Sequence, residues 1–404
     1  MNINERHSKL KSSFSATNPN ERIEQIDILR GFALFGVLLV NALGYNSSFF
    51  DFGGFYSAFT DPLNSSVYSI ITNYGADKFI GLFSFLFGVS FSIMYLKNKN
   101  TETQFANFYL RRLLILMIFG IIHIVFFWAG DILFTYSLMG IILVLSRKLP
   151  SKLLLYISVF MYFFPIIYIA LNVSYPFLPN ALSSTSNITM PEVLNIYSNG
   201  TYLEVFKLRL NEYFSFRYIN LIYYVPKIIS LFLFGYLFHK HKFFDKINAS
   251  KNNYFIVSII LLLLGIALNT YTSVIANSIV DMNTNPYSTT IYMLIFEITN
   301  VVLILSYILI ILTLAKIKFS SYILNPLKYI GRMSLTNYLL YSIIFTTIMY
   351  SYGFGKFGSF EPWQLLIFSV VFFVIQIVLC KMWLQYFRFG PFEWLWRKFT
   401  YFKR

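Results

Sequence analysis

Residues 27–46 read DILRGFALFGVLLVNALGYN, and their only charged side chains, Asp27 and Arg30, lie in the first four positions. A helix of about 20 residues is about 30 Å long, which matches the hydrocarbon core of a bilayer. The stretch after Arg30 carries no charge, so most of its surface is suited to lipid rather than to water. It predicts a transmembrane helix that begins at a charged boundary.

The composition extends this prediction to the rest of the chain. Hydrophobic residues make up 57% of the 404 residues and charged residues only 12%, about half of the roughly 25% typical of a soluble protein. Nine further apolar runs are candidates for membrane spans: 76–96, 110–128, 131–147, 152–173, 219–238, 253–273, 289–315, 333–352 and 363–385. We therefore expect an all-α, polytopic integral membrane protein with about ten transmembrane helices in residues 26–385, flanked by a polar, disordered tail at 1–25 and a basic tail at 386–404.

Positive charges predict the orientation. Of the 32 Lys and Arg residues, 25 fall on alternate loops and on the two tails, whereas residues 47–75 and 274–288 contain none. Because cytoplasmic loops are enriched in Lys and Arg, we expect both termini to be cytoplasmic and the protein to lie in the cell (plasma) membrane. Topology thus accounts for the net charge of +15, and nucleic-acid binding is not expected. The predicted outer loop 174–218 is an exception to this distribution, because it does carry Lys and Arg residues. We expect its amphipathic stretch at 202–216 to lie at the membrane surface.

Two polar features of the first span indicate a site. Asp27 and Arg30 are three residues apart, so they share a helix face and can pair. Asn41 follows Asp27 by 14 residues, which is about 21 Å along the helix axis, and falls in the outer third of the span. Each feature has a structural alternative: an interfacial ion pair that begins the helix, or an amide that binds a neighbouring helix.

The turn between the third and fourth spans carries His123, Trp128 and Asp131. Imidazole is well suited to proton transfer near neutral pH, and a neighbouring carboxylate can orient it. The alternative is that His123 binds a backbone carbonyl and Asp131 only caps the next helix. Capping does not explain an imidazole inside lipid, so an acid–base pair is the favoured interpretation.

Lys227 and Glu297 lie at similar depths in two later spans, where ionisable residues are costly and usually paired. Pro226 should kink the helix beside Lys227. We expect an intramembrane ion pair or the wall of a polar path, although Lys227 could instead extend its amine to the interface. Lys78, at the outer start of the second span, is expected to extend to the interface in that way.

Six segments form a specific set: RIEQIDILRGFALFGVLLVN at 22–41, FSFLFG at 83–88, GIIH at 120–123, GDIL at 130–133, GRMSLTNY at 331–338 and RFGPFEWLWR at 388–397. Together they resemble the YeiB-like family of bacterial membrane proteins. That family is similar to the transmembrane acyltransferase superfamily, which implies a ten-helix core and transfer of acetyl from cytoplasmic acetyl-CoA to an acceptor on the far side. Asp27, Arg30 and Gly31 match the first helix of the glycan O-acetyltransferases. Asn41 stands where those enzymes have a functional histidine, and no histidine occurs between Asn41 and His123.

The resemblance gives the polar residues expected roles in acyl transfer. His123 would be the general base, oriented by Asp131, and Asn41 would donate to the developing oxyanion. The cytoplasmic residues expected to bind acetyl-CoA are Arg30, Arg332 and Asn337. The residues expected along the substrate path are Trp128, Lys227 and Glu297.

A second hypothesis is a small-molecule transporter or exporter in which Lys227, Glu297 and Asp131 form a polar path. No convincing repeat between 27–147 and 219–385 supports it. The expected partners are the lipid bilayer and a cell-envelope glycan or small-molecule acceptor, and a homo-oligomer is compatible with the sequence. No Cys/His spacing predicts a metal site.

Overall fold

The computed structural model describes residues 23–174, 188–217, 220–249, 253–278 and 286–401, and every regular element in these ranges is helical. Residues 1–22 of the expected disordered tail and residues 175–187 of the outer loop lie outside these ranges. The predicted all-α class is confirmed.

Eight segments of the described chain are long and apolar enough to cross a bilayer: α2 (Glu24–Asn46), α4 (Pro62–Tyr74) continued by α5 (Lys78–Lys97), α6 (Glu102–Phe126), α8 (Ser151–Ser174), α12 (Val225–Lys240) with the π-helical η4 (Asn220–Tyr224) before it, α14 (Asn253–Ser278), α15 (Pro286–Leu314) and α19 (Pro362–Tyr386). Two shorter apolar helices are α7 (Leu133–Ser146) and α18 (Ser334–Met349). Each apolar run of the sequence thus corresponds to a helix, as expected of a multi-pass membrane protein. The number of crossings and the orientation stay predictions.

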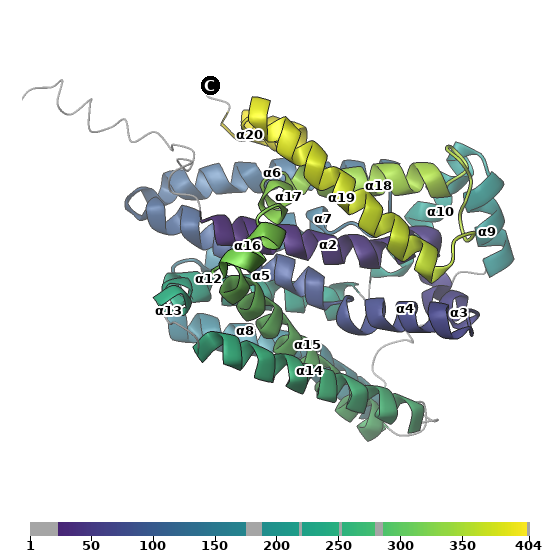
Figure 1. Ribbon diagram of the computed structural model, residues 1–404, viewed down its shortest axis with the longest axis horizontal. Helices are drawn as coiled ribbons and strands as arrows, with labels where there is room; N and C mark the ends of the chain where they lie inside the picture. The colour runs from purple at the N-terminus through teal and green to yellow at the C-terminus, as the bar shows by residue number, and fades with distance from the viewer. Residues whose placement is uncertain (1–22, 175–187, 218–219, 250–252, 279–285, 402–404) are drawn as a thin grey trace, which may run out of the picture.

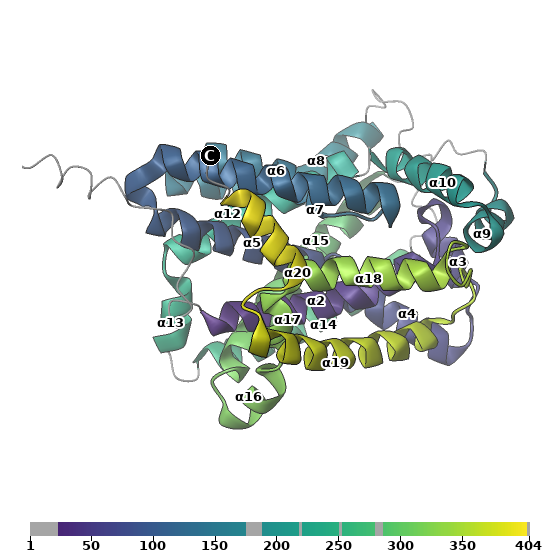
Figure 2. The same ribbon diagram turned by 90° about the horizontal axis from the view of Figure 1, so that it is seen from above.

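Helix α2 runs through the middle of the bundle, where it contacts α5, α15, α18 and α19 (Figures 1 and 2). Short helices lie at one end of the bundle: η2 (Phe49–Asp51), α3 (Phe52–Ser57), α9 (Met190–Asn199) and α10 (Tyr202–Ser215). Those toward the other end are η3 (Lys99–Thr101), α13 (Phe243–Ala249), α16 (Lys318–Leu324), α17 (Leu327–Arg332) and α20 (Pro391–Thr400). The described chain begins and ends toward that same end.

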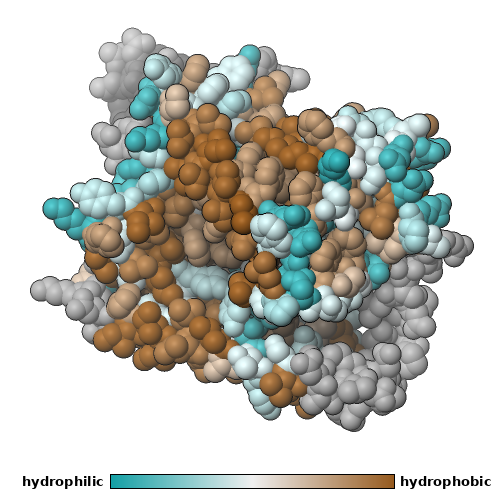
Figure 3. Space-filling view, turned by 45° about the vertical axis from the view of Figure 1, so that its right-hand side comes forward, coloured by the Kyte–Doolittle hydropathy of each residue, from teal (hydrophilic) through white to brown (hydrophobic). Residues whose placement is uncertain are grey.

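Burial separates the central helix from the peripheral ones. In the most apolar part of α2, 72% of the residues are buried, compared with 22% in α14 and 28% in α19. The peripheral helices expose large apolar side chains such as Ile260, Leu263 and Ile375, and Figure 3 shows apolar side chains over much of one face of the molecule. A surface of this kind is unfavourable in water, so lipid is its solvent.

Glycines bring two pairs of helices together at their backbones. A Cβ atom at Gly331 of α17 would lie 1.9 Å from the carbonyl oxygen of Asp27, and one at Gly31 of α2 would lie 2.1 Å from that of Leu327. Between α5 and α12, Gly88 and Gly235 make the same reciprocal approach to backbone carbonyls. Small residues allow such contacts in membrane bundles. The first pair fixes α17 against the charged start of α2.

The amphipathic stretch expected at 202–216 forms α10, and its buried face packs on the protein. Helix α10 contacts α6 and α9, and it buries Val205, Leu208, Arg209 and Glu212. Two of these four side chains are ionisable, whereas Tyr202, Leu203 and Phe214 are exposed. Helix α10 therefore docks on the protein through a partly polar face, and its expected place at the membrane surface stays a prediction.

We predict that Gly331→Ala lowers the melting temperature of the purified protein in detergent. The added methyl group would force α17 away from α2, and overpacking of this kind typically costs about 1–3 kcal/mol. Gly53→Ala is the matched control, because a Cβ atom at Gly53 would meet no heavy atom within 4 Å. Equal melting temperatures for the two variants would contradict the close backbone contact.

Candidate active site: a basic cavity beside a buried Asp–His–Ser chain

A cavity of about 630 Å³ runs along α2, with further walls from α5, α6, α17, α18 and α20. Binding sites for small molecules commonly have volumes of about 300–1,000 Å³. Asp27 and Asn41 both line it, so it follows the central helix for about 21 Å. The cavity therefore reaches from the charged start of α2 well into the bundle.

The part of the cavity near the start of α2 is strongly basic. Its lining holds three carboxylates, those of Glu24, Asp27 and Glu393. The Lys and Arg residues of the lining are more than twice as many: Arg30, Lys97, Arg112, Lys328, Arg332, Arg388 and Arg397. Such an excess concentrates anions, and guanidinium groups bind phosphates by paired hydrogen bonds.

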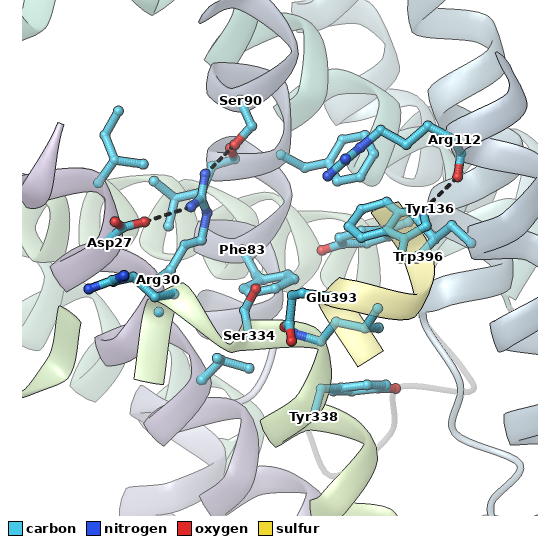
Figure 4. Close-up of a pocket in the computed structure, with 18 of the residues that line it drawn as sticks. Asp27, Arg30, Phe83, Ser90, Arg112, Tyr136, Ser334, Tyr338, Glu393 and Trp396 are labelled. Atoms are coloured by element: carbon cyan, nitrogen blue, oxygen red, sulfur yellow. Dashed lines mark hydrogen bonds and ion pairs between the residues drawn. The ribbon is translucent and has the colours of Figure 1, made fainter. Parts of the chain in front are cut away.

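Several of these cations are held in place by neighbouring side chains. The predicted pairing is present, because Arg30 Nη1 lies 2.9 Å from Asp27 Oδ1, and Arg30 Nη2 donates to Ser90 Oγ at 2.6 Å. Across the cavity, the Arg112 guanidinium lies 3.5 Å from the centre of the Trp396 ring. Figure 4 shows Asp27, Arg30 and Ser90 on one side and Arg112 with Trp396 on the other. Arg30 and Arg112 are thus held in fixed positions on opposite sides of the cavity.

Glu393 joins two of the sequence motifs at the cavity wall. Its Oε1 accepts hydrogen bonds from the backbone N–H groups of Leu335, at 2.6 Å, and Thr336, at 3.0 Å. A carboxylate is favourable at the amino-terminal end of a helix, here α18. This contact holds α20 against α18, so the segments 331–338 and 388–397 form one corner of the cavity.

His123, Asp131 and Ser342 form a chain of polar contacts inside the bundle. His123 Nδ1 lies 3.0 Å from Asp131 Oδ1, and both side chains are fully buried. On the other side of the ring, His123 Nε2 is hydrogen-bonded to Ser342 Oγ at 2.6 Å. Asp131 Oδ2 also accepts from the N–H of Phe134 at 2.7 Å. The contact between His123 and Asp131 and the cap that Asp131 makes on the next helix are therefore both present, and the role of this pair in proton transfer stays a prediction.

The chain continues from Ser342 to Tyr45 and lies beside the inner end of the cavity. Tyr45 Oη and Ser342 Oγ are 2.7 Å apart. The Tyr338 ring lies 5.3 Å from the His123 ring, measured between centres, and Tyr338 lines the cavity together with Asn41. The predicted residues Arg30, Asn41 and Arg332 thus line one cavity. His123 and Asp131 are not among its lining residues in the described chain, but they lie next to Tyr338, Gly130 and Ile132 of its wall.

Trp128 covers the Tyr45 side of these polar contacts, which faces away from the basic end of the cavity. Its ring is 4.4 Å from that of Tyr45 and 5.6 Å from that of Phe49, measured between centres. Gly44 and Gly130 both lie against the indole, where a Cβ atom would clash with it. The predicted substrate-path residue is therefore a close cover over Tyr45.

Lys227 and Glu297 belong to a second buried cluster. Lys227 Nζ lies 2.9 Å from Glu297 Oε1 and 3.3 Å from Asp77 Oδ2, so the expected ion pair is present and has a third member. The expectation for Lys78 was wrong, since its side chain is fully buried with Nζ 4.9 Å from the centre of the Phe296 ring. None of these five residues is among those that line the basic cavity.

Asn337 is not among the cavity-lining residues of the described chain. Its side-chain amide donates to the carbonyl oxygen of Met333 at 2.9 Å and contacts Cys380 Sγ at 3.3 Å. The structure therefore does not bring it to Arg30 and Arg332, and its amide contacts the start of its own helix and Cys380 of α19. Within the described ranges, no group of three His, Cys, Asp or Glu side chains is placed to hold a metal ion.

Comparison with known proteins identifies the family. Residues 238–403 match the family described as "Protein of unknown function (DUF418)". The chain is 30% identical to the uncharacterized protein YxaH of Bacillus subtilis (strain 168), over 96% of this chain and 97% of that protein. The chain belongs to the YeiB-like family. It is also 27% identical to YeiB of Escherichia coli (strain K12), over 94% and 96% of the two chains. No solved structure matches it.

The family match and the site overlap only in part. Arg332, Ser342 and Glu393 fall within the matched residues 238–403, whereas His123 and Asp131 precede them. The similarity of this YeiB-like chain to YxaH extends over nearly all of both proteins, so it includes both halves of the site.

A buried carboxyl group supports the Trp128 side of the site in this YeiB-like protein. Glu212 of α10 accepts hydrogen bonds from Ser48 Oγ, from the N–H of Phe49 at 3.2 Å and from Tyr197 Oη at 2.5 Å. Burial raises the pKa of this carboxyl to about 7, and these hydrogen bonds oppose a larger rise. One turn earlier, Arg209 donates to backbone carbonyls at the end of α6, including Phe127 at 3.2 Å. Together these contacts hold the ends of α2 and α6 beside Trp128.

We predict that Glu212→Gln flattens the dependence of stability on pH. The folded state keeps the Glu212 proton up to about pH 7, whereas the unfolded chain releases it near the ordinary pKa of 4.5. Stability should therefore fall as the pH rises through this window, by up to roughly 3 kcal/mol from this group. Melting temperatures measured between about pH 5 and pH 8 test this. Glu192→Gln, at an exposed position of α9, is the control, and parallel curves for wild type and Glu212→Gln would refute the prediction.

Proposed function

We propose that this protein is a membrane-embedded acyltransferase of the plasma membrane, which takes an acetyl group from cytoplasmic acetyl-CoA and delivers it to a cell-envelope acceptor on the far side. The observation that supports this most directly is the course of one cavity, from a cluster of arginines to Gly130, Ile132 and Tyr338, which lie next to the buried His123–Asp131 pair. Acetyl transfer from acetyl-CoA would use both parts, because arginines can bind the phosphates of CoA and an imidazole can take the proton of the attacking hydroxyl.

The cavity suits a donor with phosphates at one end and a long, thin arm. Arg112 and Arg332 lie in its basic part and would pair with phosphates. Between these residues and Asn41, the lining is largely apolar, with Leu34, Val37 and Phe87 among its members. A pantetheine arm would run along this stretch and place its thioester near Tyr338.

His123 has the surroundings of a general base. Asp131, 3.0 Å from Nδ1, favours the tautomer with the proton on that nitrogen, which leaves the lone pair on Nε2 free to accept a proton. The same carboxylate stabilises the imidazolium that forms when the proton is accepted. The hydroxyl of Tyr45 and the amide of Asn41 are the groups that would donate to an oxyanion on the thioester carbonyl.

Transport is the second candidate function, and the cluster of Asp77, Lys227 and Glu297 favours it. Ionisable groups buried in membrane helices often belong to ion or substrate pathways. Both carboxylates pair with Lys227, and none of the three residues is among those that line the cavity. Small-molecule flux into proteoliposomes would support transport over acyl transfer if it persists in His123→Asn and disappears in Lys227→Met.

We predict that His123→Asn and Asp131→Asn each lower the rate of acetyl transfer by about 10²–10⁴-fold, because general acid–base catalysis contributes about that much. The measurement is release of CoA by purified protein with labelled acetyl-CoA and cell-envelope glycan fragments. His241→Asn is the control, since His241 is an exposed residue at the end of α12. A His123→Asn protein that folds and turns over at the wild-type rate would exclude this mechanism.

We predict that Arg112→Gln weakens binding of acetyl-CoA by roughly 10–100-fold, the value of a hydrogen bond to a charged group, with little change in kcat. Arg112→Lys should lie between the two, because it keeps the charge and loses the planar stack on Trp396. Lys318→Gln, at an exposed lysine of α16, is the control for the loss of one positive charge. Titration calorimetry with CoA gives the affinities, and equal values for Arg112→Gln and wild type would remove the cavity as the donor site.

A further inference from the structure

We propose that Ser342 is the nucleophile that carries the acyl group between donor and acceptor, a proposal that rests on the acyl-transfer function above. Its sequence context does not single it out, because a serine in an apolar helix commonly bonds only to its own backbone. The structure places its hydroxyl at the end of the Asp131–His123 pair. Carboxylate, imidazole and hydroxyl in this order form the arrangement that activates serine nucleophiles.

The contacts of Ser342 differ from those of neighbouring hydroxyls. Thr346 and Thr347, on the same helix, donate to the backbone carbonyls four residues before them, at 2.7 and 2.6 Å. Ser342 Oγ is instead bonded to two side chains, His123 Nε2 at 2.6 Å and Tyr45 Oη at 2.7 Å. Its hydroxyl is thus directed to the interior of the site.

The direction of the hydrogen bonds depends on which ring nitrogen of His123 carries the proton, and we place it on Nδ1, 3.0 Å from Asp131 Oδ1. Nε2 can then only accept, so the Ser342 hydroxyl donates to it. Ser342 Oγ then accepts from Tyr45 Oη. His123 is therefore positioned to take the Ser342 proton, and the Tyr45 hydroxyl is positioned beside the oxygen that attacks.

Ser342 also lies between the two sides from which the substrates come. Tyr338, one turn earlier on α18, lines the donor cavity. Tyr45, bonded to Ser342, stacks on Trp128, which covers the opposite side. A carrier at this position would receive the acyl group from the cavity and release it past Trp128, so donor and acceptor need never meet.

The reaction would proceed in two balanced steps. In the first, Ser342 Oγ forms a bond to the thioester carbonyl carbon, its proton passes to His123 Nε2, and the C–S bond breaks, with the thiolate taking that proton to leave as CoA–SH. In the second, an acceptor hydroxyl attacks the Ser342 ester and its proton passes to His123 Nε2. The bond between carbonyl carbon and Ser342 Oγ breaks, and Ser342 regains the proton.

The test is to incubate the full-length protein in lipid nanodiscs with acetyl-CoA labelled in its acetyl group, without any acceptor, and to quench with acid. We expect CoA release that stops near one equivalent per protein, and one labelled acetyl group on the peptide that contains Ser342. Ser342→Ala should lose both the label and the release, and Ser342→Cys should carry a label that neutral hydroxylamine removes. Ser369→Ala, which alters another fully buried serine of a membrane helix, is the control and should be labelled like wild type.

The outcomes separate this proposal from the acyltransferase function. If wild type cleaves acetyl-CoA only when a glycan acceptor is present and never holds label, transfer is direct: the Ser342 proposal fails and the acyltransferase function stands. Label on a residue other than Ser342 leads to the same conclusion. If wild type neither binds nor cleaves acetyl-CoA under either condition, the acyltransferase function fails and the Ser342 proposal fails with it. Melting temperatures of the Ser342 variants, compared with Ser369→Ala, show that a loss of label is not a loss of fold.

Discussion

A charged group inside a membrane protein must find a partner within the protein, because hydrocarbon supplies none. This constraint organises the whole molecule. The described chain is apolar along most of its helices, and many of its buried ionisable groups gather in the basic cavity, the His123–Asp131 pair, the cluster around Lys227 and the contacts of Glu212. Each place joins at least two helices. Polar contacts therefore help to specify which apolar helices become neighbours, a choice that lipid-like surfaces alone would leave open.

Backbone contacts set the position of the basic end of the cavity. At Gly31 and Gly331, α2 and α17 approach each other with no room for a side chain. Arg332 follows Gly331 directly, and Asp27 and Arg30 precede Gly31, so one close contact brings all three charged residues to the cavity. Glu393 completes the same corner by bonding the first N–H groups of α18. The sequence motifs that resemble the YeiB-like family thus correspond to one physical assembly.

The helices could be predicted from the sequence, and so could the contacts between residues that lie close together along the chain. Contacts between residues far apart along the chain could not. Apolar runs are sufficient to locate spans, because each must be about as long as the bilayer is thick. The His123–Asp131 pair was predictable because a tight turn joins the two helices that carry it. Nothing in the sequence indicated Ser342, which meets His123 across 219 positions, or Asp77, which meets Lys227 across 150.

Asn337 was given a role from its motif, whereas its amide is directed to Met333 and Cys380. Lys78 was expected at an interface, and the packing of α5 against α15 buries it.

The length of the cavity has a consequence for what would cross the membrane in an acyltransferase of this design. It follows α2 for about 21 Å of a hydrocarbon core of about 30 Å, and the Trp128 turn covers its inner end. A phosphorylated donor would therefore keep its charges in the basic part, where arginines offset the loss of water. Only the acyl group would pass from one side to the other. That group is small and neutral, so its transfer through the bundle carries little desolvation penalty compared with that of a phosphate or a sugar. A hydroxyl beside the cavity would then carry the only group that passes, and the charges of the donor need not follow it.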